Sequence, residues 1–342
     1  MKKIRIFNYP WHLAHQYELM KIPDTEWTWL SQHRRQYSLM PRGDFVKKFN
    51  VKYVPYYEKG KYDVALLHLD QQCLEDSLWA IGKGSVYREI NSVIKDIPKI
   101  VIMHGTPFYP EKFDCDITKE NYIQKGFNKH QIGMSSQLII EVKKIVGSNL
   151  VITNSKTAAK QWGIGTPIIH GLDKEEWLDL PKEPRVVTMI SAGGLDKYYD
   201  RTFLETVKEE LRERDIQLCH ITVDAFFRNW EEYKNFLGRS LVYFNPTKES
   251  PMPRSRTEAM LSGCCVVTTP HQDASDFIED GKNGFIVKRN PSMVADLIQK
   301  LIFDYKNTIK VGQEGKKTAL ELFDGDRFRQ DWRKLLEKVT KK

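Results

Sequence analysis

The segment from Asn245 to Thr269 contains the residues with the clearest chemistry. An apolar run ends at Asn245, Glu249 follows in a proline-containing loop, and Arg254 and Arg256 stand where a helix is predicted to begin. The N-terminus of a helix attracts anions, because its free N–H groups and its dipole both favour negative charge. Arginines beside such a terminus predict a site for a diphosphate.

The same segment predicts how this helix begins and ends. Ser255 as the N-cap and Glu258 three residues later have the spacing of a capping box, and Gly263 is a common residue at a helix end. Glu258 in the first turn and Glu249 before the helix could accept hydrogen bonds from sugar and ribose hydroxyls. The alternative is that Glu258 only caps its own helix, since capping boxes are common.

Short apolar runs alternate with helical patterns along the whole chain, which predicts βα units and parallel sheets. The expected strands are Lys3–Tyr9, Tyr62–Leu69, Lys99–Met103, Leu150–Thr153, Pro167–Ile169, Val186–Ile190, Gln217–Val223, Leu241–Asn245, Cys264–Thr268 and Phe285–Val287. The expected helices are Trp11–Met20, Thr202–Arg214, Trp230–Leu237, Glu258–Leu261 and Asp326–Val339. Ligands bind at the carboxyl ends of strands in such sheets.

Composition and hydropathy indicate a globular protein. Hydrophobic residues make up 41% and charged residues 29% of the 342 residues. No apolar run approaches the roughly 18 residues that span a bilayer, and no signal-peptide core follows the basic residues of the N-terminus. The five cysteines are scattered, and none forms a CxxC pair. We therefore expect a cytoplasmic protein, with at most peripheral contact at the inner membrane face, whose cysteines are reduced and bind no metal.

The formal charge of +8 lies mostly in the first half, where residues 1–150 hold 22 Lys and Arg against 16 Asp and Glu. Such an excess suits an anionic acceptor, such as lipid headgroups, an acidic glycan or a nucleic acid, but a solvated surface explains it equally well. Arg34 and Arg35 lie near Trp27 and Trp29, and basic residues among aromatics can bind phosphates and stack bases.

His12 and His15 follow the first expected strand. In a sheet of this kind the loop after a strand lies at the ligand-binding edge. Both histidines are therefore candidate acceptor contacts, as are Arg34 and Arg35, with a plain surface role as the alternative.

Several motifs in fixed order resemble glycosyltransferase family 4, a retaining family with the GT-B fold. The resemblance covers most of residues 100–340, and its motifs are Asn154-Ser155-Lys156, Ile169-His170-Gly171-Leu172-Asp173, Glu249, Glu258-Ala259-Met260, Gly263, Val266-Val267 and Asp280-Gly281-Lys282-Asn283-Gly284-Phe285-Ile286-Val287. It implies an α/β, GT-B architecture of two Rossmann-like doubly wound domains that face a central cleft.

The resemblance also implies domain roles. Residues 1–170 would form the acceptor-side domain, and residues 185–322 would bind the nucleotide sugar. The polar, proline-punctuated stretch 171–184 reads as the linker. Residues 323–342 resemble the terminal helix that crosses back to the first domain.

The site residues are implied in the same way. Glu258 would bind the ribose, Glu249 would contact the donor sugar, and His104 would line the sugar pocket, which makes His104 and Glu249 the catalytic candidates. The remaining residues implied in donor binding are Lys197, Gly193, Gly194, Arg254 and Ser255. The donor would be a nucleoside-diphosphate sugar, a UDP- or GDP-sugar, with no tightly bound cofactor and no metal.

We therefore expect a hexosyltransferase that moves a sugar to a glycan or lipid acceptor with retention of configuration. Two alternatives remain open: transfer to modified DNA bases, which the basic first half suits, and a non-catalytic nucleotide-sugar-binding scaffold. The second rests on departures from the family pattern. Eight residues instead of seven separate Glu249 from Glu258, and Ala192 stands where the family has an arginine.

Overall fold

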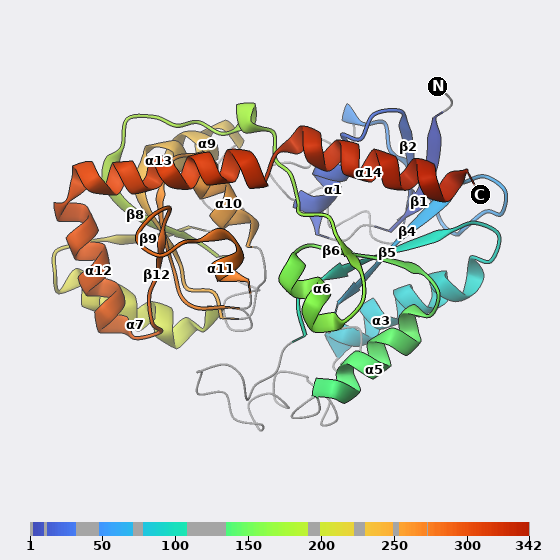
Figure 1. Cartoon of the computed structure of the whole chain (residues 1–342), viewed down its shortest axis with the longest axis horizontal. Helices are drawn as coiled ribbons and strands as arrows, with labels where there is room; N and C mark the ends of the chain where they lie inside the picture. Colours follow the sequence, from blue (N-terminus) through green and yellow to red (C-terminus); the bar gives the residue numbers. More distant parts are fainter. Residues whose placement is uncertain are drawn as a thin grey trace. The chain divides into compact units, whose positions relative to one another are not determined.

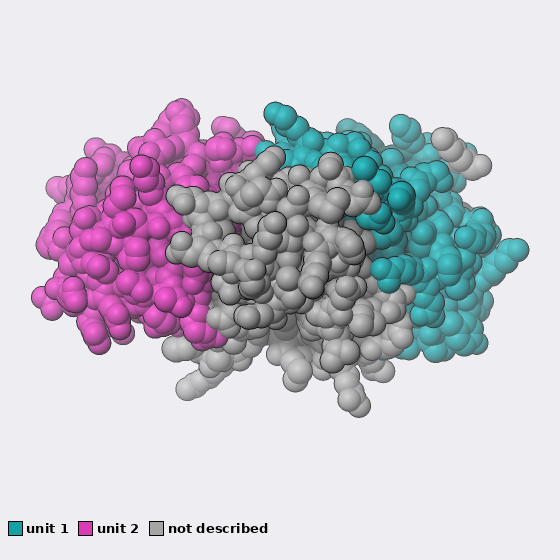
Figure 2. Space-filling view, turned by 90° about the horizontal axis from the view of Figure 1, so that it is seen from below, with its two compact units in different colours: residues 1–171, 325–342 teal, residues 172–324 magenta. Residues whose placement is uncertain are grey.

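The computed structural model divides the chain into two compact units, which Figure 2 shows in different colours. Unit 1 comprises residues 1–171 and 325–342, and unit 2 comprises residues 172–324. The structure describes residues 3–9, 12–31, 48–70, 78–107, 135–190, 199–221, 230–248, 253–271 and 273–341.

Unit 1 contains a parallel sheet of seven strands in the order β3-β2-β1-β4-β5-β6-β7 (Figure 1). The strands are β1 (Ile4–Asn8), β2 (Thr25–Leu30), β3 (Lys52–Val54), β4 (Val64–Asp70), β5 (Lys99–His104), β6 (Leu150–Thr153) and β7 (Thr166–Pro167). The strand order reverses between β1 and β4, so their carboxyl ends form the switch point at which such sheets bind ligands.

Helices cover both faces of this sheet. The helices are α1 (Leu13–Leu19), α3 (Leu78–Val93), α5 (Ser135–Val146), α6 (Lys156–Trp162) and α14 (Gly325–Thr340). Alternate strand residues such as Ala65 and Leu67 pack with apolar side chains of α3, α5 and α6. Val64 and Leu66 point to the opposite face and pack with α1 and α14. The near-continuous apolar strands follow from this burial on both faces.

Unit 2 contains a parallel sheet of five strands in the order β12-β11-β10-β8-β9. They are β8 (Glu183–Met189), β9 (Leu218–Ile221), β10 (Ser240–Asn245), β11 (Cys265–Thr268) and β12 (Phe285–Ile286). The helical segments are η4 (Lys174–Glu176), α7 (Arg201–Arg212), α9 (Trp230–Arg239), α10 (Arg254–Leu261), α11 (Ala274–Phe277), α12 (Pro291–Phe303) and α13 (Tyr305–Leu322). Here the switch point lies between β8 and β10, and the expected α/β fold of two Rossmann-like doubly wound domains is confirmed.

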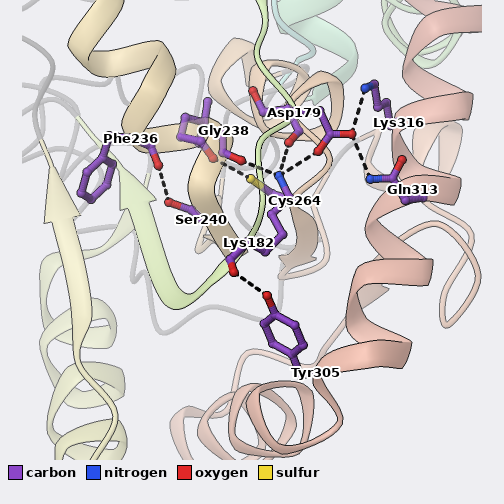
Figure 3. Close-up of polar contacts among 11 residues, drawn as sticks. Asp179, Lys182, Phe236, Gly238, Ser240, Cys264, Tyr305, Gln313 and Lys316 are labelled. Carbon is purple, nitrogen blue, oxygen red and sulfur yellow. Dashed lines mark hydrogen bonds and ion pairs between the residues drawn. The ribbon is translucent and has the colours of Figure 1, made fainter.

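The N-terminal segment of unit 2, which lies within the stretch 171–184 expected to be the linker, packs against this unit. Figure 3 shows the ammonium group of Lys182, which is buried and donates to the carbonyl oxygens of Gly238, at 2.7 Å, and of Ser262. Asp179 pairs with it at 3.2 Å and accepts a hydrogen bond from Lys316 of α13 at 2.9 Å. A buried lysine is retained where its charge is paired and its donors are satisfied, as they are here.

The last helix, α14, belongs to unit 1 in packing although it follows unit 2 in sequence. Its buried Phe328, Trp332 and Leu336 recur at a spacing of four residues and join the core on the α1 side of the sheet. The Arg327 side chain donates to the carbonyl oxygen of Ile169 at 2.8 Å.

Two strands of unit 1, β2 and β3, were not among those expected from the sequence. β2 contains Trp27 and Trp29, whose side chains are 3% and 0% exposed. The hypothesis that these tryptophans stack on nucleic-acid bases is therefore wrong, because both rings are core side chains.

Candidate functional site

Helix α10 begins two residues earlier than the capping-box pattern indicates. It starts at Arg254, Pro253 is its N-cap, and Ser255 lies inside the first turn. The Ser255 hydroxyl accepts a hydrogen bond from the Tyr243 hydroxyl at 2.7 Å and caps nothing. The predicted capping box is therefore wrong. A proline fits this N-cap because its φ of −58° is close to the value that its ring imposes.

Glu258 consequently lies in the second turn, where its carboxylate is held from two helices. Its Oε1 accepts from Arg254 Nε at 2.9 Å, and its Oε2 accepts from the Tyr233 hydroxyl of α9 at 2.6 Å. The side chain is 8% exposed. These two contacts orient the carboxylate. The idea that Glu258 only caps its own helix is wrong.

Polar side chains hold the ends of β10 and β11 together beside α10. Asn245 donates to the Thr268 hydroxyl at 3.1 Å and accepts from the Thr247 hydroxyl at 2.7 Å. Thr269 in turn donates to the carbonyl oxygen of Thr247 at 2.7 Å. This buried network fixes the start of the loop that carries Glu249.

Arg256 does not flank the helix terminus as the sequence suggested. It is fully buried, its Nη1 lies 3.4 Å from His271 Nε2, and its guanidinium stands over the Phe277 ring. Burial lowers the pKa of Arg256, while nearby Asp273 opposes that shift. Arg254 is engaged with Glu258, so the positive charge nearest the surface of this terminus is already paired.

Four predicted donor-site residues lie outside the described residues: Gly193, Gly194, Lys197 and Glu249. Among the described ones, the structure brings Arg254 and Glu258 into direct contact and places Ser255 on the same short helix. Tyr233 was missed by sequence reasoning, because it stands 25 residues before its partner on another helix. No local pattern links such a pair.

In unit 1, His104 is the last residue of β5 and is 7% exposed. His12 and His15 gather around it, with ring centroids 4.6 and 5.7 Å from that of His104. His68 of β4 is the third neighbour and stacks on His104, with centroids 5.2 Å apart and planes inclined by 21°. These four residues are called the histidine cluster below. His104 ends β5, His68 lies within β4, and the other two follow β1, one of them in α1.

The structure thus brings together the catalytic candidate His104 and the two expected acceptor contacts, His12 and His15. It adds His68 to them. Arg34 and Arg35 lie outside the described residues. A histidine inside an apolar strand signals a hydrogen-bonded buried group, since buried polar side chains are almost always paired. That signal was available for His68 and was overlooked. Within the described part of the chain, no group of His, Cys, Asp or Glu is arranged to hold a metal ion.

Comparison with known proteins finds a similarity that lies in the second unit. Residues 188–318 match the family described as glycosyl transferases group 1. The match lies within unit 2 and covers less than half of the chain. The chain is also 27% identical to spore coat protein SA of Bacillus subtilis (strain 168) over 163 residues, which are 47% of this chain and 43% of that protein. The match therefore spans less than half of the curated relative.

Two solved structures share the fold over nearly the whole chain. HepE of Anabaena in complex with UDP and glucose aligns with a TM-score of 0.66 at 14% identity, over 98% of this chain and 100% of that one. Sucrose-phosphate synthase of Thermosynechococcus elongatus aligns with a TM-score of 0.66 at 12% identity, over 98% and 99% of the two chains. The expected resemblance to GT-B glycosyltransferases is confirmed. In the described part of the chain, no helix is long and apolar enough to cross a membrane.

Proposed function

We propose that the protein transfers a hexose from a nucleoside-diphosphate sugar to a glycan or lipid acceptor, with retention of anomeric configuration. The observation that carries the proposal is Glu258, an oriented carboxylate beside two strand ends within the residues that match the group 1 glycosyl transferases. HepE, which has the same fold, was solved with UDP-glucose, and UDP is the nucleotide we favour over GDP.

The donor would be bound in unit 2. Glu258 would accept hydrogen bonds from the two ribose hydroxyls, and Lys197 with the Gly193-Gly194 turn would contact the diphosphate. Arg254 supports this task by orienting Glu258 through the 2.9 Å contact. Because the leaving group is a nucleoside diphosphate, the main catalytic demand is to stabilise its growing negative charge, and fixed positive groups and N–H donors supply this.

The two catalytic candidates, Glu249 and His104, would contact the sugar of the donor. His104 has the position for this role within its own unit, since it ends a strand at the ligand-binding edge of a parallel sheet. His12 and His15, together with Arg34 and Arg35, are proposed acceptor contacts. An acceptor at an anionic membrane surface on the cytoplasmic side would suit the positive charge of residues 1–150.

The test is sugar transfer and donor hydrolysis with UDP-, GDP- and ADP-sugars, followed as release of the nucleoside diphosphate. We expect release from a UDP-sugar that falls at least about tenfold, or about 1.4 kcal/mol in activation free energy, in His104→Ala and in Glu258→Gln. His220→Gln and Glu321→Gln, which change a histidine and a glutamate of unit 2 that are not among the candidate site residues, should act like the wild type. Release that persists in both site variants would reject the assigned site. No release from any sugar nucleotide, combined with tight nucleotide binding, would favour the scaffold alternative.

A further inference from the structure

The centre of the histidine cluster is His68, a side chain that no motif singled out. It lies in the middle of the sheet on β4 and is completely buried. Its Nδ1 is 2.9 Å from His104 Nε2, a hydrogen-bond distance between two imidazole rings. We propose that His68 is the positioning residue of His104, which fixes the orientation of the His104 ring. This inference rests on the proposed role of His104.

The backbone at His68 is fixed independently of its ring. The Tyr9 hydroxyl donates to the carbonyl oxygen of His68 at 2.6 Å and accepts from its N–H at 2.8 Å. Tyr9 follows β1, so the clamp joins the two strands at the switch point of the sheet. A ring carried on such a backbone has little freedom to shift, which is what a positioning group needs.

His68 is held in its neutral form. Burial lowers its pKa well below the usual value for histidine, and the nearby His15 and His12 act in the same direction. A neutral imidazole carries one N–H and one acceptor nitrogen, so its two nitrogens always have opposite roles. Whichever role His68 Nε2 takes, Nδ1 therefore has the other role toward His104.

On the side of the ring away from His104, Nε2 of His68 has a partner for either role, hydrogen-bond donor or acceptor. His68 Nε2 lies 2.9 Å from Asn8 Oδ1, which only accepts, and 2.9 Å from Gln16 Nε2, which only donates. The two amides are bonded to each other, Asn8 Nδ2 to Gln16 Oε1 at 2.7 Å, and both side chains are fully or almost fully buried. An amide pair of this kind offers one acceptor and one donor to the same nitrogen.

The consequence concerns His104. If His68 Nε2 donates to Asn8, Nδ1 accepts a hydrogen bond from His104 Nε2–H. If Gln16 donates to His68 Nε2, then Nδ1–H donates to His104 Nε2. His68 can therefore stay bonded to His104 in either protonation pattern, and the ring of His104 keeps its place while its proton changes position. A partner that could only donate or only accept at Nε2 would stabilise only one of the two protonation patterns.

Two conservative variants separate this role from general packing. In His68→Asn, the side-chain amide occupies the position of Nδ1 and can still bond His104. In His68→Gln, the amide reaches the position of Nε2, so it keeps Asn8 and Gln16 but loses His104. We expect His68→Gln to lower kcat by about 10- to 100-fold, the usual effect of misplacing a reacting group, with a much smaller change in the donor KM. His68→Asn should keep most of the wild-type kcat.

A second readout does not require any sugar nucleotide. In protein labelled with ¹⁵N-histidine, the ring nitrogens of His104 are assigned by their loss in His104→Gln, with His220→Gln as the control for an unrelated histidine. In the wild type and in His68→Asn, we expect ¹⁵N chemical shifts for the His104 ring that are typical of hydrogen-bonded nitrogens. In His68→Gln, we expect shifts averaged over the two positions of the ring proton. Unchanged His104 shifts and unchanged kcat in a folded His68→Gln protein would overturn the proposal. If the wild type transfers no sugar, the proposed function fails, while the nitrogen shifts still decide the role of His68.

Discussion

At the scale of single residues, the candidate residues of each unit are polar side chains whose orientation depends on partners far away in sequence. Glu258 is oriented by Tyr233 from another helix, and His104 contacts His68, which lies on the neighbouring strand. Motif order indicated Glu258 and His104, because the types and spacing of motif residues are visible in a sequence. Their partners were not predicted, since side chains 25 and 36 residues away meet only once the sheet has formed.

The burial of His68 predicts a pH-dependent stability. Its pKa is well below 6.5 in the folded protein and rises to about 6.5 on unfolding. Above pH 6.5 the residue is neutral in both states. As the pH falls below that value, the unfolded state takes up the proton first, so the free energy of unfolding should decrease by up to about 1.4 kcal/mol per pH unit.

Urea unfolding at pH 7, 6 and 5, followed for the wild type and His68→Asn, measures this effect. We expect the variant to lose stability less steeply between pH 6.5 and 5, because it lacks the titrating ring. Equal slopes for both proteins would show that His68 does not titrate differently on unfolding.

At the scale of elements, α10 depends on α13 for its place. A Cβ on Gly312 of α13 would lie 2.4 Å from the carbonyl oxygen of Gly263 and 3.1 Å from the N of Cys265. Gly263 ends the turn after α10 with a φ of +70°, a conformation that glycine adopts without steric cost. Sequence reasoning placed Gly263 correctly after the helix but did not reveal that another helix packs onto it.

Gly312→Ala should therefore destabilise unit 2. Alanine gains about 1 kcal/mol in helix propensity, but overpacking against backbone atoms costs about 1–3 kcal/mol and more when neither side can move. We expect a lower melting temperature for unit 2, whereas Lys310→Ala, an exposed change on the same helix, should leave it near the wild-type value. A Gly312→Ala protein as stable as the wild type would mean that α13 shifts away at no cost.

The ends of elements were predicted less well than their existence. The strands with long apolar runs, such as β4 and β5, were found within two residues of their observed ends. β2 was missed because its alternating tryptophans and polar residues were interpreted as a surface patch. The start of α10 was misplaced because Pro253 caps it, while Ser255 offered a more familiar pattern.

At the scale of the whole molecule, the chain passes from unit 1 to unit 2 and returns. The return matters energetically, because α14 contributes Trp332, with no exposed side-chain surface, to the core of unit 1. Trp332→Ala should cost about 3–5 kcal/mol, the usual range for removing a buried tryptophan. The seven-stranded sheet should then melt at a lower temperature.

Calorimetry with and without UDP checks this prediction unit by unit. We expect Trp332→Ala to lower the transition of unit 1 while UDP still raises that of unit 2, and the exposed change Lys334→Ala to have little effect on either. An unchanged transition of unit 1 in Trp332→Ala would contradict the assignment of α14 to its core.

Binding of the donor nucleotide in unit 2 through Glu258 can be measured by titrating the protein with UDP. At a UDP concentration of about 100 Kd, binding should add roughly 2.7 kcal/mol to the stability of the unit that holds the site. We predict a UDP-dependent rise in melting temperature that exceeds those with GDP and ADP. The rise should be lost or strongly reduced in Glu258→Gln and kept in Glu321→Gln. An equal response to UDP in Glu258→Gln, or no response of the wild type to any of the three nucleotides, would show that Glu258 does not bind the donor nucleotide.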